Sequence, residues 1–120
     1  MRYILALVVY LLTCAGALCG DSPQEIYLLI GQSNMAGRAK ITPEIAGVLQ
    51  GAMLLNKNGT WEPAKNPLNK YSSIRKSAKM QRLGPGYGFA RELIKQRPKV
   101  TVGLVVNAKN IYDGTIMPAF

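Results

Sequence analysis

One serine stands where a parallel sheet could use it as a nucleophile. Ser33 lies in Gly-Gln-Ser-Asn-Met-Ala-Gly-Arg, residues 31–38, directly after a six-residue apolar run that begins with glutamate. If a helical turn begins at Ser33, its free backbone N–H groups point at the serine oxygen and could stabilise the oxyanion formed by attack on an ester. The other interpretation is a serine that caps a helix or turn. Spacing alone favours the cap, because short motifs match by chance.

The same stretch departs from two familiar motifs. Met35 occupies the place of the second glycine in the G-x-S-x-G nucleophile elbow. Gly31 and Gly37 are one residue too far apart for a phosphate-binding P-loop, and Arg38-Ala39 replaces its Lys-Ser/Thr pair. Neither an α/β-hydrolase elbow nor a nucleotide site is therefore indicated.

Two further stretches could donate hydrogen bonds to an oxyanion. Gly84-Pro85-Gly86-Tyr87-Gly88 leads into an expected helix, and its glycines let the backbone approach a ligand closely. Phe89 occupies the last position of a G-x-G-x-x-G match, so a dinucleotide site is poorly supported. Asn107 follows an apolar run, and its side-chain amide could donate to the oxyanion. Each stretch alone is also ordinary turn chemistry.

The elements that must position these residues follow from the apolar pattern. Residues 25–30 and 99–107 are apolar runs typical of buried strands. Residues 84–97 predict a helix with one apolar face, which Pro98 ends. A helix linked to two buried strands indicates an α/β sheet with parallel strands.

The middle of the chain predicts a hairpin and a long loop. Residues 52–64 read as two short strands joined by an Asn-Gly turn at 58–59. A short helix could start at Thr42, with Pro43 in its first position. Residues 64–83 are a basic loop, and loops of this length in compact domains are often functional.

The first nineteen residues have the shape of a secretory signal peptide. A positive charge at Arg2 precedes an apolar run and then small residues. We therefore expect a secreted or periplasmic protein whose domain spans residues 20–120. A lipid anchor on Cys19 is the less favoured alternative, because Leu18 is bulky where such signals need a small residue.

Composition argues against several kinds of site. The chain of 120 residues has no histidine, and both cysteines, Cys14 and Cys19, lie in or at the edge of the signal segment, so we expect no zinc site and no internal disulfide. Its formal net charge is +9. The basic loop could contact nucleic acid, an anionic glycan or a membrane, but no nucleic-acid motif accompanies it, and a solvated loop is the favoured interpretation.

Three stretches together resemble a known family. "IYLLIGQSNMAGR", "LGPGYGFAREL" and "VGLVVNAK" are similar to the opening blocks of the carbohydrate-esterase branch of the SGNH hydrolase superfamily, with sialate O-acetylesterases and acetylxylan-esterase-like proteins the nearest in likeness. The loop "NKNGTWEPAKNPLN" fits the same branch. The resemblance implies a flavodoxin-like three-layer α/β/α domain. It also implies hydrolysis of acetyl esters on sugars through a serine acyl-enzyme, with no metal or organic cofactor.

The resemblance also implies roles for individual residues. Ser33 matches the nucleophile, whose own backbone N–H is one oxyanion donor. Gly86 and Asn107 match the other two donor positions. Gln32 and Asn34 flank the nucleophile and would contact the acetylated carbohydrate substrate.

Two departures from the family pattern bear on activity. The family draws its base from an Asp-x-x-His pair, and this sequence contains no histidine. Asn110 and Ile111 stand where the family has a glycine pair, with Asp113-Gly114-Thr115 as a displaced remnant. We therefore interpret the chain as the N-terminal part of an esterase domain, inactive alone, with a non-catalytic glycan-binding or interaction module as the alternative. In such a part, the strand at 100–106 is expected to expose an unpaired edge or an apolar face, which favours association.

Overall fold

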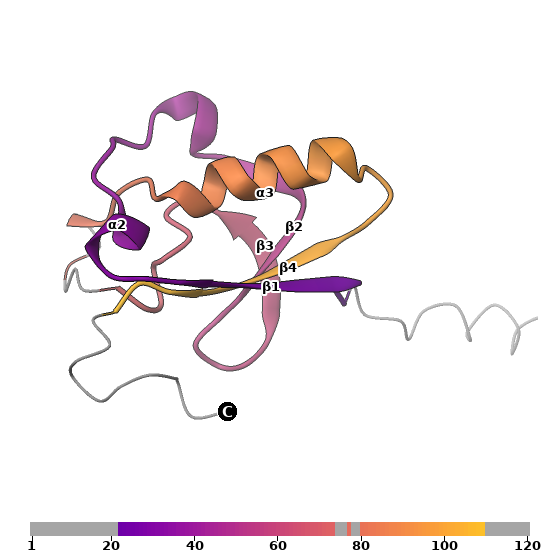
Figure 1. Ribbon diagram of the computed structural model, residues 1–120, viewed down its shortest axis with the longest axis horizontal. Helices are drawn as coiled ribbons and strands as arrows, with labels where there is room; N and C mark the ends of the chain where they lie inside the picture. Colours follow the sequence, from indigo (N-terminus) through magenta and orange to yellow (C-terminus); the bar gives the residue numbers. More distant parts are fainter. Residues whose placement is uncertain (1–21, 74–76, 78–79, 110–120) are drawn as a thin grey trace, which may run out of the picture.

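The sheet that carries the expected site has four strands. The computed structural model describes residues 22–73, 77 and 80–109, and the signal-peptide expectation for residues 1–19 lies outside them (Figure 1). The sheet order is β1-β4-β2-β3. The strands are β1 (Glu25–Ile30), β2 (Val48–Leu55), β3 (Trp61–Lys65) and β4 (Val102–Asn107). The helical elements are α2 (Ser33–Ala36), the 3-10 turn η1 (Pro43–Ile45) and α3 (Pro85–Gln96).

Strands β1 and β4 run parallel, as the two apolar runs predicted. Their register begins at the pair Glu25 and Val102 and ends at the pair Ile30 and Asn107. The strands therefore end side by side, and the Gly31 N–H donates to the Asn107 carbonyl oxygen at 3.0 Å. This places the stretch after β1 beside the stretch after β4 at one edge of the sheet.

The hairpin is confirmed, and the expected short helix is present as a 3-10 helix of three residues. Strands β2 and β3 pair antiparallel around the expected turn, where Asn56 Oδ1 accepts bonds from the N–H groups of Asn58 and Thr60. Thr42 is the N-cap residue of this helix and Pro43 is its first residue, but it ends at Ile45 and β2 already begins at Val48. Strand pairing with β4 and β3 outweighs the weak helix signal there.

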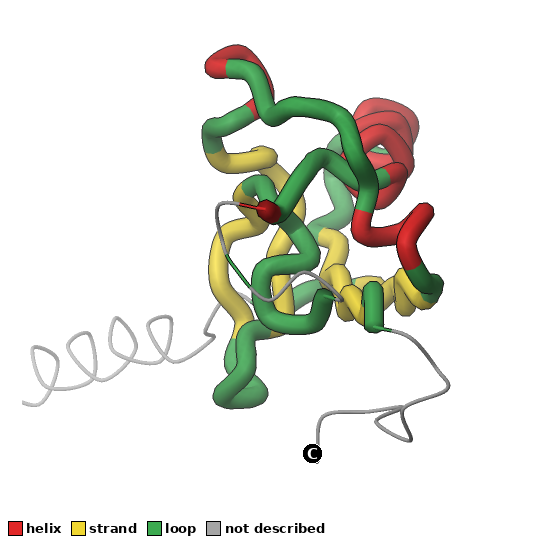
Figure 2. Tube along the Cα trace, turned by 90° about the vertical axis from the view of Figure 1, so that its left-hand side faces the viewer, coloured by secondary structure: helices red, strands yellow, loops and turns green. Residues whose placement is uncertain are grey.

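The core lies between the sheet and α3. Leu54, Val102 and Leu104 are the largest fully buried side chains, and Ala90 of α3 is 0% exposed against them. Tyr27 on β1 meets Phe89 on α3 edge to face, with ring centroids 5.4 Å apart. In Figures 1 and 2, α3 covers one side of the sheet, and no described helix covers the other.

The edge strands of the sheet are β1 and β3, which corrects the expectation for the strand at 100–106. β4 lies between β1 and β2, so both of its edges are paired. The exposed apolar face belongs mainly to β1, where Ile26, Leu28 and Ile30 are 61%, 50% and 50% exposed. A buried central strand follows from pairing on both sides, which the sequence of one strand cannot specify.

Over the same described ranges, none of the helices combines the length and the apolar character that crossing a membrane demands. Likewise, no group of three or more His, Cys, Asp or Glu side chains in them could hold a metal ion.

Leu104→Ala tests the position of the core. The substitution removes a fully buried side chain and should lower the free energy of unfolding by about 2–5 kcal/mol, from lost transfer energy and a cavity. Urea unfolding followed by circular dichroism measures this. Leu28→Ala, on the neighbouring strand but half exposed, is the matched control and should cost about 1 kcal/mol or less. Equal losses in the two variants would contradict this core.

Candidate active site

Ser33 begins the four-residue helix α2, and two residues separate it from the end of β1. The first bond of this turn runs from the Ala36 N–H to the Gln32 carbonyl oxygen at 3.0 Å, so the N–H groups before it have no acceptor within the helix. Ser33 is half-buried, and Gln32 and Asn34 are exposed on either side of it. Within the described residues, the Ser33 side chain has no hydrogen-bond partner. The hydroxyl is thus placed at the surface of the fold, next to N–H groups that have no acceptor within the helix.

The backbones of the α2 turn and of the approach to α3 touch. A Cβ on Gly84 would lie 2.3 Å from the Met35 carbonyl oxygen, and a Cβ on Gly37 would lie 1.9 Å from the Leu83 carbonyl oxygen. The Leu83 N–H donates to the Ala39 carbonyl oxygen at 2.9 Å, which ties the same two segments together. Glycine at these two positions is therefore a condition for bringing the serine stretch and the glycine stretch together.

Gly86 lies in the first turn of α3, where backbone N–H groups lack an acceptor within the helix. It is buried, and a Cβ there would lie 2.8 Å from Leu29 Cδ1 on β1. The glycine lets the start of α3 sit directly on the strand that leads to Ser33. The structure brings Gly86 into the neighbourhood of the α2 turn, as its predicted role as a donor requires.

Asn107 ends β4 and is buried, with 8% of its surface exposed. Its Oδ1 accepts bonds from Ser72 Oγ at 2.9 Å and from the Lys109 N–H at 3.1 Å. Because an N–H can only donate, the amide atom facing Lys109 must be the oxygen. These two bonds fix the orientation of the Asn107 amide beside the end of β1.

Three buried polar side chains of the loop after β3 belong to this region, and the sequence alone did not single them out. Asn66 Nδ2 donates to the Ile45 carbonyl oxygen at 2.9 Å. Asn69 Nδ2 donates to the Ala36 carbonyl oxygen at 2.8 Å, and Ser72 donates to Asn107. The sequence indicated a functional loop over 64–83, but buried asparagines in a polar loop look like any turn residues until their partners are known.

An ion pair fastens this loop to β3. Lys70 Nζ lies 2.7 Å from Glu62 Oε1, and the Tyr71 hydroxyl donates to both Glu62 oxygens at 2.8 and 2.7 Å. The bond from Lys70 holds the pKa of Glu62 below its usual value, and the bond from Tyr71 adds to this. The bond to Glu62 raises the pKa of the Tyr71 hydroxyl. The cluster anchors the segment that carries Asn66 and Asn69.

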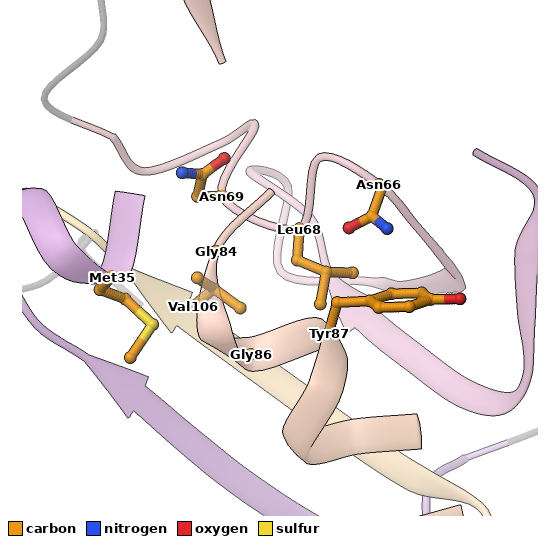
Figure 3. A pocket seen from close by; sticks show the side chains of 8 residues that line it. All are labelled: Met35, Asn66, Leu68, Asn69, Gly84, Gly86, Tyr87 and Val106. Atoms are coloured by element: carbon orange, nitrogen blue, oxygen red, sulfur yellow. The ribbon is translucent and has the colours of Figure 1, made fainter. Parts of the chain in front are cut away.

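A small cavity lies between α2, the start of α3 and the loop after β3 (Figure 3). Its volume is about 10 Å³, which is room for about one water molecule. Its lining residues are Met35, Asn66, Leu68, Asn69, Gly84, Gly86, Tyr87 and Val106. The cavity therefore touches α2, the start of α3, β4 and the loop after β3.

Among the described residues, no side chain that could act as a base is hydrogen-bonded to Ser33. Glu25 pairs with Arg97 at the far end of β1, roughly 17 Å from Ile30 at about 3.3 Å per residue. Glu62 is held by Lys70 and Tyr71. The backbone N–H of Lys109 donates to Asn107 Oδ1. The side-chain amine of Lys109, however, has no hydrogen bond to Ser33.

Comparison with known proteins defines the class: the chain belongs to the carbohydrate esterases. The family model that matches, over residues 23–117, is described as carbohydrate esterase, sialic acid-specific acetylesterase. The family expected from the three sequence blocks is thereby confirmed. A search of the curated proteins gave no significant match.

Among solved structures, the chain is similar to the crystal structure of a protein from Arabidopsis thaliana. The two share 28% identity with a TM-score of 0.62, and the match covers 74% of this chain. The chain spans 42% of the length of that protein.

Gly84→Ala tests the contact between the two backbones. The added methyl would overlap the Met35 carbonyl oxygen, so the free energy of unfolding should fall by about 1–3 kcal/mol. Gly88→Ala is the matched control, because a Cβ there meets nothing within 4 Å and alanine favours the helix, which should stabilise by up to about 1 kcal/mol. Urea unfolding of the parent and both variants measures these changes in the free energy of unfolding. Two losses of similar size would count against the close approach.

Glu62→Gln tests the anchor of the loop through pH. Because the folded-state pKa of Glu62 is lowered, its stabilising effect is present above the usual value of 4.5 and is lost as the pH falls through the folded-state value. The variant should therefore be less stable than the parent by about 0.2–1 kcal/mol at neutral pH. The difference should vanish near pH 2. A difference that is the same at both pH values would argue against the ionised pair.

Proposed function

We propose that the chain carries the nucleophile and oxyanion half of a carbohydrate O-acetylesterase site, with Ser33 as the nucleophile. The observation that carries the proposal is the convergence of three separate stretches at one edge of the sheet. Ser33 follows β1, Asn107 ends the adjacent β4, and Gly86 lies in the turn packed on β1. Membership of the carbohydrate esterases supplies the reaction class.

The reaction would proceed by acyl transfer. Ser33 Oγ bonds to the carbonyl carbon of the acetyl ester, its proton leaves to a base, and the carbonyl π pair moves onto oxygen. The N–H groups of Ser33 and Gly86 and the amide of Asn107 would donate to this oxyanion. Collapse breaks the bond to the sugar oxygen, which takes up a proton, and water then releases acetate from the acetyl-serine.

An acidic sugar such as an acetylated sialic acid is the favoured substrate, with acetylated xylan as the neutral alternative. Arg38 and Lys40 follow the α2 turn directly, and Arg82 lies on the segment bonded to it through Leu83 and Ala39. The chain carries 15 Lys and Arg residues against 6 Asp and Glu residues. Such a surface raises the local concentration of an anionic substrate. Gln32 and Asn34, both exposed beside Ser33, would contact the sugar.

The missing histidine sets the expected rate. Removing one member of a nucleophile–base unit can cost about 10⁴-fold or more, so we propose that this chain alone turns over acetyl esters negligibly. An added small base should then restore part of the reaction, because under this proposal the chain retains the nucleophile and the oxyanion donors.

Rescue by imidazole tests this proposal. Hydrolysis of p-nitrophenyl acetate and of an O-acetylated sialic acid is followed with increasing imidazole, for the parent chain and for Ser33→Ala. We expect a Ser33-dependent rate that grows with imidazole, above the background that imidazole gives with Ser33→Ala. Identical rates for the two folded proteins at every concentration would contradict Ser33 as the nucleophile.

The absence of histidine also favours a second candidate, a non-catalytic glycan-binding module that uses the same surface. NMR titration with the acetylated sugar separates the two. Shifts at the amides around Ser33 without any Ser33-dependent turnover in imidazole would support the binding module. Acetylated xylan serves as the neutral comparison ligand.

A further inference from the structure

The side chain of Asn69 is almost completely enclosed, with 3% of its surface exposed. Its Nδ2 donates to the Ala36 carbonyl oxygen at 2.8 Å. Its Oδ1 is a buried atom without a hydrogen-bond partner in the described part of the chain. An acceptor left unsatisfied in the interior costs about 1–3 kcal/mol, so a buried amide with one end unused calls for an explanation.

The bonded end of Asn69 acts on the turn that carries Ser33. Ala36 is the last residue of α2 and Ser33 is the first. A helix of four residues has little stability of its own, because helix nucleation is unfavourable. Its terminal carbonyls need outside partners, and Asn69 supplies one from a loop 33 residues further along the chain.

The unbonded end of Asn69 belongs to a side chain that lines the cavity between α2 and α3 (Figure 3). The cavity has room for about one water molecule, and Gly84 and Gly86, which have no side chains of their own, border it. A water there would give Oδ1 the donor that it lacks. The same water would reach toward the segment that begins α3.

We propose that Asn69 is a positioning residue for Ser33, which holds the end of α2 through Nδ2 and binds one buried water through Oδ1. Asn69 thereby links the nucleophile turn with the glycine stretch of the oxyanion site. The catalytic value of this positioning rests on the proposed function. The bond from Asn69 to Ala36 and the water at Asn69 Oδ1 do not depend on it. The experiments below measure the contacts without any turnover, so their failure is distinguishable from failure of Ser33 as the nucleophile.

Asn66 offers a matched control within the same loop. It is also a buried asparagine that lines the cavity, and its Nδ2 also donates to a backbone carbonyl. Its acceptor is Ile45 in η1, however, and not α2. Asn66→Ala therefore removes a bond of the same kind without touching the Ser33 turn.

Amide hydrogen exchange measured by NMR separates the two asparagines. In Asn69→Ala, the amides of Ala36 and Gly37 should exchange at least about tenfold faster than in the parent, while those of α3 and β4 change much less. In Asn66→Ala, the Ile45 amide should accelerate and the α2 amides should not. Unchanged exchange at Ala36 and Gly37, or the same acceleration throughout the fold, would overturn the positioning role.

Asn69→Asp adds a readout that loss of packing would not give. A protonated aspartate presents one donor and one acceptor, like asparagine, whereas the carboxylate has no donor for the Ala36 carbonyl. Burial raises the pKa of such a carboxyl group, so protection of the α2 amides should be close to normal at low pH and should be lost as the pH rises through that value. Protection independent of pH, compared with the parent, would overturn the donor role.

The water is tested by a crystal structure of the parent chain at high resolution. Density for one water within about 3.2 Å of Asn69 Oδ1, inside the cavity, supports the proposal. An empty cavity, or a protein donor on Oδ1, would overturn the water site.

Discussion

Close contact between two backbones is the constraint on which the rest of this structure depends. The turn after β1 and the segment that begins α3 meet without side chains between them. Gly37 and Gly84 allow this because they have no Cβ, and a Cβ at either position would overlap the opposite backbone. A side chain at either position would separate the serine stretch from the glycine stretch. With the contact in place, parallel pairing of β1 and β4 adds the third stretch, because their carboxyl ends meet at one edge.

The loop after β3 completes this arrangement with polar bonds instead of apolar packing. Asn66, Asn69 and Ser72 reach η1, α2 and Asn107, and the Glu62 ion pair fixes the loop to the hairpin. Buried polar side chains with specific partners fix one arrangement better than apolar contacts, since each misplacement leaves a group unsatisfied. The loop is therefore best understood as a frame for the Ser33 turn.

The fold leaves β1 at an open edge, with an apolar face exposed to solvent. A parallel sheet is usually covered on both faces, and an unprotected edge strand is a common route to association. Over the described ranges, one face is covered by α3 and the other is not. The strand that positions the nucleophile is thus also the least protected strand of the sheet.

The sequence by itself determined the strands β1 and β4, the hairpin, the helix α3 and the membership of the carbohydrate esterases that the family comparison confirmed. These features depend on local patterns: apolar runs, an Asn-Gly turn and a helix ended by proline. The tertiary structure alone decided that β4 lies inside the sheet, that the helix after Thr42 gives way to β2 after one turn, and that Asn69 bonds to the end of α2. The physical reason is distance along the chain, because strand order and a bond between residues 36 and 69 arise from packing of remote segments, which no local pattern encodes.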